Sequence, residues 1–497
     1  MAEATTPATQ RPATPARTIG AIRTATLWVA AILLLLAPAG FAFNSGGYFY
    51  RPQLFAGIAV FALLGFVAVA ARWPLVVRGA PLAALASLTG LTLWTGLSIS
   101  WSRVLGPATD DTDRVVLYCA CFALALVVMR DRRIRDVAPD VVLLGIAVVA
   151  LYALGGRLLP HVVPTSAIGK AGSRLAQPLT YWNAEGLFLA TGVLLGVAVA
   201  SNEARPRWLR SVACAAAVPC GFAGFLTFSR GAGAALLGGM LVLLLMRPRR
   251  SAIAAAIVAG AGTAVLCVLL VAFPAVRALD RGVSSQASQG AVLAGIAALV
   301  TVAAGLAYAR LARGRDSGFA IPPPRGRKLA LVTVPVLLGA AVALGLSAEQ
   351  SPNLPSGASR LVTFEANRKA YWRVALDAFA HHPLNGVGTA SFQVEWRRER
   401  KSADFTTDAH SIYLETLAEL GIVGGLLLAA LYASVLTGLA RSARAAPGDP
   451  VLAAAAAVLA AFAIHSGVDW DWEMPAAALP ALIMAAVAVQ RGNRMEP

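Results

Sequence analysis

His410 stands where a polar stretch of the chain meets an apolar run, and histidine is the side chain best suited to accept a proton near neutral pH. It follows Thr407 and Asp408, either of which can cap the N-terminus of a helix. We therefore expect His410 in a first helical turn, where the positive end of the helix dipole disfavours a protonated imidazole. The predicted chemistry is general-base catalysis by a neutral imidazole. The alternative is a structural histidine that bonds a carbonyl group at the membrane interface.

Two arginines have the chemistry to bind an anion. Arg230 lies between two apolar runs, a depth at which an arginine is costly unless it is paired or faces a watery cavity. Arg368 lies four residues before Trp372 in a segment predicted to form an amphipathic helix. Because a guanidinium group offers paired hydrogen bonds to phosphate oxygens, both arginines are candidates for an anion clamp. The alternatives are an interfacial arginine that extends to lipid headgroups at 230 and a solvated charge at 368.

Two other polar clusters are weaker candidates. His381 and His382 are adjacent, and adjacent helical positions diverge by about 100°, unlike the i, i+4 spacing of a metal pair. His465 precedes three acids and two tryptophans at 469–473, which could hold a sugar, although an aromatic belt with solvated charges is favoured. The five cysteines fall inside apolar runs, without metal-ligand spacing or a disulfide framework. No metal or other cofactor is expected.

The elements that must position these residues are membrane helices. Of the 497 residues, 58% are hydrophobic and only 13% are charged, about half the charged fraction of a soluble protein. Apolar runs of about 16–22 residues recur along the chain, and in lipid such runs must be helical, because a helix satisfies its own backbone. The net charge of +17 arises mostly from arginines in short loops between these runs, so we expect no nucleic-acid partner. The predicted fold class is all-α, a polytopic transmembrane helical bundle.

We expect about fourteen spans, with both termini in the cytoplasm. This orientation places about 25 of the 42 Lys and Arg on the cytoplasmic side, as the positive-inside rule favours. No Asp or Glu falls in the middle of a span, which argues against a proton-coupled or sodium-coupled transporter. The predicted spans are 25–43, 54–71, 81–100, 115–129, 138–155, 184–200, 211–228, 232–246, 252–273, 290–309, 329–347, 421–440, 451–466 and 475–490.

The chain is predicted to divide into five parts. These are a disordered cytoplasmic tail at 1–22, a transmembrane bundle of about eleven spans at 23–350, one long external loop at 351–420, C-terminal spans at 421–490 and a cytoplasmic tail at 491–497. We expect short amphipathic helices in the external loop. Because that loop contains both Arg368 and His410, we expect it to be the catalytic part.

Several short phrases stand in a fixed order between about residues 90 and 440. They are Trp94 to Ser102, Arg174 to Asn183, Ser229-Arg230-Gly231, Arg368 to Trp372, the His-Pro-Leu-Asn-Gly-Val-Gly phrase that starts at His382, and the His-Ser-Ile-Tyr-Leu-Glu phrase that starts at His410 and leads to Leu420-Gly421. Together they resemble the O-antigen ligase / O-antigen polymerase family of polytopic membrane glycosyltransferases. The last two phrases in succession are quite specific, whereas the Ser-Arg-Gly phrase alone would be weak.

The resemblance implies a multi-pass enzyme of the bacterial cytoplasmic membrane. It would transfer an undecaprenyl-diphosphate-linked glycan, outside the membrane and without a metal, to a hydroxyl of a glycan, lipid or protein acceptor. Carried onto this chain, Arg230 and Arg368 would hold the diphosphate, and His410 would deprotonate the acceptor. Diphosphate leaves readily once its charge is stabilised, whereas a sugar hydroxyl is a poor nucleophile and needs a base. The residues expected to contact substrate are Arg174, Asn183, His382, Tyr413 and Trp372.

Three questions about function stay open at this point. The motifs do not separate a ligase, which transfers glycan to a lipid or protein, from a polymerase, which extends a polysaccharide. A non-enzymatic alternative is a flippase or exporter of lipid-linked sugars, which many spans and a basic outer face would suit. A third is a polymerase of the related peptidoglycan type, which would need a catalytic acid. The external acids near a span are Glu185, Asp408 and those at 469–473.

Overall fold

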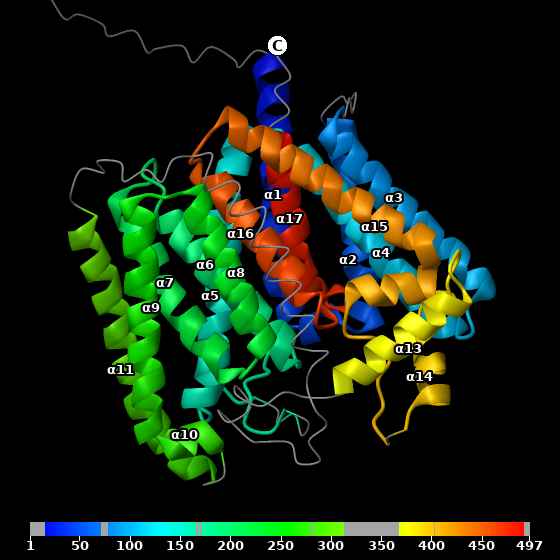
Figure 1. The fold of residues 1–497 in the computed structure, drawn as a ribbon. Helices are drawn as coiled ribbons and strands as arrows, with labels where there is room; N and C mark the ends of the chain where they lie inside the picture. Colours follow the sequence, from blue (N-terminus) through cyan, green and yellow to red (C-terminus); the bar gives the residue numbers. More distant parts are fainter. Residues whose placement is uncertain are drawn as a thin grey trace, which may run out of the picture.

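The structure is a computed structural model that describes residues 15–70, 78–165, 168, 171–279, 282–312, 367–401 and 403–491. Every regular element in these ranges is a helix, which confirms the predicted all-α class (Figure 1). The longer helices are α1 (Pro15–Ala42), α2 (Tyr50–Ala70), α3 (Ala80–Ser98), α4 (Leu105–Val128), α5 (Arg132–Leu158), α6 (Trp182–Ala200), α7 (Arg207–Leu226), α8 (Arg230–Met246), α9 (Arg250–Leu269), α11 (Val283–Leu311), α15 (Ile412–Ala445), α16 (Pro450–His465) and α17 (Pro475–Arg491). The shorter ones are α10 (Pro274–Ala278), α13 (Asn367–His381), α14 (Phe392–Glu399) and the 3-10 turns η1 (Ser45–Gly47), η2 (Ile99–Trp101), η4 (Leu270–Ala272) and η6 (Asp471–Glu473).

The prediction of a multi-pass membrane protein is confirmed. Among the described residues, nine helices are long and apolar enough to cross a membrane, and α8, α16 and α17 are shorter apolar helices. Every predicted span except 329–347 falls on a described helix, and that one lies outside the described residues. The total of fourteen spans and the cytoplasmic position of both termini stay predictions.

Helix α6 is the centre of the bundle. Its apolar stretch is 94% buried inside the protein, against 17% for α2 and 22% for α11, and α11 lies at an edge of the bundle in Figure 1. Glycines let the neighbouring helices come close, as is typical of helix packing in membranes. A Cβ on Gly196 of α6 would lie 2.9 Å from the carbonyl oxygen of Ala213 in α7, and one on Gly239 of α8 would lie 2.8 Å from that of Ala457 in α16.

Loops that the topology assigns to one side of the membrane meet at one end of the bundle. At the predicted cytoplasmic end, Arg491 of α17 forms ion pairs with Asp136 of α5 and with Asp449 before α16. At the opposite end, where α13 and α14 lie in Figure 1, Arg368 pairs with Asp469 across a separation of 101 residues. Each of these contacts joins segments that the predicted topology assigns to the same side of the membrane.

The long polar loop packs its backbone onto a kink in α15. Gly421 has φ +64, which breaks the helix at the predicted start of a span, so that Ile412 to Leu420 form a separate first segment. The amide of Ile422 donates to the carbonyl of Pro383 at 2.8 Å, and the amide of Val387 donates to that of Ala418 at 2.9 Å. A Cβ on Gly421 would lie 2.3 Å from the carbonyl oxygen of Leu384. The phrase from His382 to Gly388 and the Leu420-Gly421 pair are thus two halves of one backbone contact.

Candidate functional site

One cavity gathers most of the residues that could do chemistry. It has a volume of about 120 Å³ and lies where α13 and the start of α15 meet the ends of α6 and α8. Its lining residues are Arg174, Tyr181, Trp182, Asn183, Phe228, Arg230, Gly231, Arg368, Tyr371 and His410. Five of the predicted site residues are among them, namely His410, Arg230, Arg368, Arg174 and Asn183. We call this cavity the arginine pocket.

Arg230 reaches the pocket because α8 begins there. The side chain of Ser229 accepts a hydrogen bond from the amide of Ala232 at 3.2 Å and so caps the helix, after Phe228 has turned the chain at φ +49. Arg230 is the first residue of the helix, where backbone amides and the helix dipole favour a negatively charged ligand. The second cation, Arg174, lies with its guanidinium carbon 3.4 Å from the centre of the Trp182 ring. The pocket therefore combines a helix N-terminus with several guanidinium groups.

The third cation, Arg368, is held by Asp469. This carboxylate is 1% exposed and accepts hydrogen bonds from Arg368 and Asn183 on one oxygen, both at 2.6 Å. Its other oxygen accepts from the hydroxyl of Tyr181 at 2.7 Å and from the amide of Trp470 at 3.0 Å. Burial opposes ionisation, but the charge of Arg368, followed by the effects of His410, His465 and the Tyr181 hydroxyl, lowers the pKa of Asp469 below its usual range. An ionised Asp469 thus fixes the position of two predicted site residues.

His410 lies just before a helix and not in its first turn, so that prediction was wrong. α15 begins at Ile412, with Ser411 as its N-cap residue, and the backbone of His410 has φ +55. The carboxylate of Glu415, in the first turns of α15, accepts a hydrogen bond from the amide of Ala409 at 2.7 Å and so ties the preceding residues to the helix. The chain needs a left-handed residue here to turn into the helix.

The imidazole of His410 is nevertheless suited to act as a base. Nδ1 lies 3.1 Å from the carbonyl oxygen of Asp408, which can only accept, so Nδ1 carries the proton and Nε2 keeps the lone pair. Burial lowers the pKa of His410 below its usual value; Asp469 opposes this change and Arg368 adds to it. A ring contact with Tyr371, at 5.2 Å between centres, helps to orient the imidazole. The neutral state predicted from the helix dipole thus arises mainly from burial.

Three predicted site residues lie outside the arginine pocket. Trp372 is 2% exposed and packs in an apolar cluster formed by α13, α14 and the start of α15. Tyr413 donates its hydroxyl hydrogen to the carbonyl of Ala463 at 2.8 Å and so joins α15 to α16. His382 is exposed, and its carbonyl accepts from the amide of Gly386 at 3.0 Å in the turn that packs on α15. Their observed contacts are structural.

Sequence reasoning missed the importance of the last predicted external loop, 465–474. Its three acids were expected to be solvated, and this was wrong, because Asp469, Asp471 and Glu473 are all buried. The loop also holds the start of α15, since the amide of Ile412 donates to the carbonyl of Ser466 at 2.9 Å. Other residues that the prediction omitted are Tyr181, Trp182 and Tyr371. The first two precede Asn183 directly, and Tyr371 lies one turn after Arg368, so their spacing from predicted residues was the available signal.

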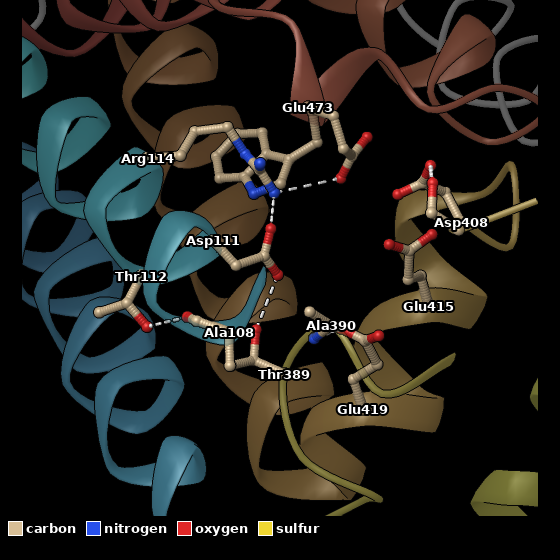
Figure 2. A network of polar contacts seen from close by, with 12 residues as sticks. Ala108, Asp111, Thr112, Arg114, Thr389, Ala390, Asp408, Glu415, Glu419 and Glu473 are labelled. Atoms are coloured by element: carbon tan, nitrogen blue, oxygen red, sulfur yellow. Dashed lines mark hydrogen bonds and ion pairs between the residues drawn. The ribbon is translucent and has the colours of Figure 1, made fainter. Parts of the chain in front are cut away.

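A second polar cluster brings together side chains of α4, the long loop, the start of α15 and the last external loop (Figure 2). Asp111 of α4 pairs with Arg114 and accepts from the hydroxyl of Thr389 at 2.7 Å, and Arg114 also pairs with Glu473 at 3.6 Å. Figure 2 shows Asp408 and Glu415 beside this network. Burial raises the pKa of Glu473 to about 8, with Arg114 opposing the rise. The network joins α4 to the long loop and to the last external loop.

The carboxylates of this second cluster are close together. One oxygen each from Asp408, Glu415 and Glu473 lie within 4.8 Å of one another, an arrangement that could hold a metal ion. Glu419 is already used, because it accepts from the amides of Ala390 and Phe392, both at 2.8 Å. The expectation of a metal-independent protein stays untested.

Comparison with known proteins places part of this site in a family. Comparison with curated proteins finds no match for the chain. Residues 282–429 match the family model described as O-Antigen ligase. The match includes Arg368 and His410, whereas Arg230 and Asp469 lie outside it. This match, over residues 282–429, supports the O-antigen ligase family that the order of the motifs predicted.

Proposed function

We propose that this protein transfers a glycan from an undecaprenyl-diphosphate carrier to an acceptor hydroxyl on the outer face of a bacterial cytoplasmic membrane. The observation that carries the proposal is the arginine pocket, in which Arg174, Arg230 and Arg368 meet the imidazole of His410. An anion clamp and a neutral base in one cavity are the two groups that this reaction needs. The match of residues 282–429 to the O-Antigen ligase model supports a role in membrane glycan ligation or polymerisation.

The arginines would act on the leaving group. A diphosphate gains negative charge as the bond from its oxygen to the anomeric carbon breaks, and guanidinium groups stabilise that charge without supplying a proton. The amides of the first turn of α8 add to this stabilisation, because Arg230 begins that helix at the pocket. Undecaprenyl diphosphate then leaves as the stabilised anion.

His410 would act on the acceptor. Nε2, which keeps its lone pair because Nδ1 donates to the carbonyl of Asp408, takes the proton of the acceptor hydroxyl. The hydroxyl oxygen forms the new bond to the anomeric carbon on the side opposite the departing diphosphate, so direct attack inverts that carbon. The reaction as proposed uses no nucleotide sugar and no metal. Ligation to a lipid or protein and extension of a polysaccharide share these steps.

The alternative function, a flippase or exporter of lipid-linked sugars, would use the cations of the arginine pocket but not the base. A half-buried histidine of fixed tautomer beside the cations favours the enzyme, since moving a diphosphate lipid across a membrane transfers no proton from a hydroxyl. The two functions therefore differ in what they require of His410.

A deletion experiment in the source organism tests the proposal. Loss of the protein is expected to abolish one surface glycan, and its lipid-linked precursor is expected to accumulate on the outer leaflet. Complementation with His410→Ala should fail, whereas His382→Ala, a matched change at an exposed histidine outside the pocket, should restore the glycan. Accumulation of the precursor on the inner leaflet would overturn the transferase proposal and favour the flippase.

A further inference from the structure

The protein contains a buried histidine–aspartate pair that the proposed reaction does not use. His465, the last residue of α16, places Nδ1 2.5 Å from an oxygen of Asp471, and both side chains are 0% exposed. A carboxylate accepts, so Nδ1 donates. Nε2 of His465 is buried and has no hydrogen-bond partner among the described residues. A polar atom left in this state costs free energy, so its location is informative.

Nε2 lies against the first turn of α8. A Cβ built on Gly231 would stand 3.0 Å from Nε2 and 3.1 Å from the neighbouring ring carbon of His465. The imidazole thus occupies the space that a side chain at position 231 would fill. Gly231 directly follows Arg230, and both residues line the arginine pocket. The glycine of the Ser229-Arg230-Gly231 phrase is explained by this contact, since a larger residue would push α8 away from α16.

Asp469 and Asp471 of the last external loop therefore connect to both arginines of the predicted clamp, one directly and one through His465. Asp469 bonds directly to Arg368 at 2.6 Å. Asp471 acts through His465, whose ring contacts the residue beside Arg230. These two arginines are 138 positions apart in the sequence and come from different helices, so some element must set the distance between them. The stretch from Asp469 to Asp471 contacts Arg368 directly, and it contacts His465, which lies against Gly231 beside Arg230.

We propose that His465, held by Asp471, is a positioning residue for the diphosphate clamp. This inference rests on the proposed function, because the diphosphate clamp is assigned there. The imidazole fixes the separation of α8 from α16 at the first turn of α8, and this separation determines where Arg230 and the first helical amides stand relative to Arg368. Displacing a binding group by about 1 Å can cost up to about a hundredfold in rate or affinity. His465 itself takes no part in proton transfer to the acceptor.

The test uses the purified full-length protein in lipid nanodiscs, with an undecaprenyl-diphosphate-linked glycan as donor and a glycan acceptor. His465→Asn keeps a donor for Asp471 at the place of Nδ1 but removes the ring atoms that touch Gly231. We expect the KM for donor to rise by about tenfold to a hundredfold, with the KM for acceptor and Tm near those of the native protein. A purely structural role would instead lower Tm and affect both substrates.

Gly231→Ala should raise the donor KM in the same way, because its methyl group meets the imidazole. The double variant Gly231→Ala with His465→Asn should lie closer to the native protein than Gly231→Ala alone, since the ring atoms in conflict are gone. Gly233→Ala is the matched control, because a Cβ there has nothing within 4 Å. Additive effects in the double variant, or an unchanged donor KM in His465→Asn, would refute the positioning role.

The variant Arg230→Ala tests the diphosphate clamp separately from the positioning role of His465. If Arg230→Ala raises the donor KM and the variants at His465 and Gly231 do not, the inference fails and the clamp stands. If Arg230→Ala leaves donor binding unchanged, the clamp itself is wrong, and with it the inference.

Discussion

The substitution Asp469→Asn removes one negative charge from the centre of the site without changing its shape. Asp469 serves four donors: Arg368 and Asn183 on one oxygen, and Tyr181 and the amide of Trp470 on the other. An asparagine side chain keeps one acceptor oxygen and turns a hydrogen-bearing nitrogen toward the other pair. Whichever way the amide is oriented, two donors in a buried place lose their acceptor.

The size of the effect follows from those two lost bonds. Leaving a buried donor without its partner costs about 1–3 kcal/mol, so the folded site loses about 3 kcal/mol. Arg368, with a quarter of its side chain exposed, is then free to leave its position. If the whole cost appears in the transition state, kcat/KM for the donor falls by roughly a hundredfold.

The assay for Asp469→Asn is glycan transfer by purified protein, combined with Tm in detergent. Asp377→Asn makes the same chemical change on α13, at a half-exposed carboxylate outside the arginine pocket, and should behave like the native protein. We expect Asp469→Asn to lower both Tm and kcat/KM. If Tm and kcat/KM of Asp469→Asn both equalled those of the native protein, the conclusion that the last external loop organises the site would be refuted.

Three further predictions concern the pH profile, the metal and the kink. Because burial and Arg368 lower the pKa of His410, kcat/KM should stay high as the pH falls to about 6.5 and be lost below it, when the imidazole is protonated. Arg368→Gln removes a repelling charge, so the acid limb of the remaining activity should move to higher pH; a shift to lower pH would contradict the assignment of that limb to His410. Addition of a chelator should leave glycan transfer unchanged, whereas loss of transfer that added Mg²⁺ or Mn²⁺ restores would show that a metal takes part. Gly421→Ala should lower Tm, because φ +64 strains an alanine and its Cβ would lie 2.3 Å from the carbonyl oxygen of Leu384; an unchanged Tm would contradict the kinked packing.

Much of the fold was predictable because lipid allows few solutions. Apolar runs had to be helices, and the arginine-rich short loops predicted which ends of those helices meet. The arginine pocket was predictable in part. Placing an arginine between two apolar runs, or a histidine just before an apolar run, costs free energy unless the residue has a function. His410, Arg230 and Arg368 do share a cavity.

The rest depended on tertiary contacts that no local pattern records. The acids at 469–473 have the composition of a solvated membrane-surface loop, yet Asp469 is buried because a guanidinium group from α13 and an amide and a hydroxyl group from the start of α6 converge on it. His382 looked chemically active, but the phrase that contains it packs its backbone on α15. The start of α15 was misplaced because three residues, Thr407, Asp408 and Ser411, can each cap a helix. The contact of Ile412 with Ser466 favours the last of them.

The most direct test of the central claim is to measure donor binding and turnover separately in His410→Ala. The purified variant, in nanodiscs, would be given an undecaprenyl-diphosphate-linked glycan and an acceptor. We predict that the Kd for donor stays at its native value, because the arginines are intact, while kcat falls by about 10²–10⁴-fold. Turnover at the native rate with the donor bound normally would contradict the account, since the arginine pocket would then bind a diphosphate without the base that makes it an active site.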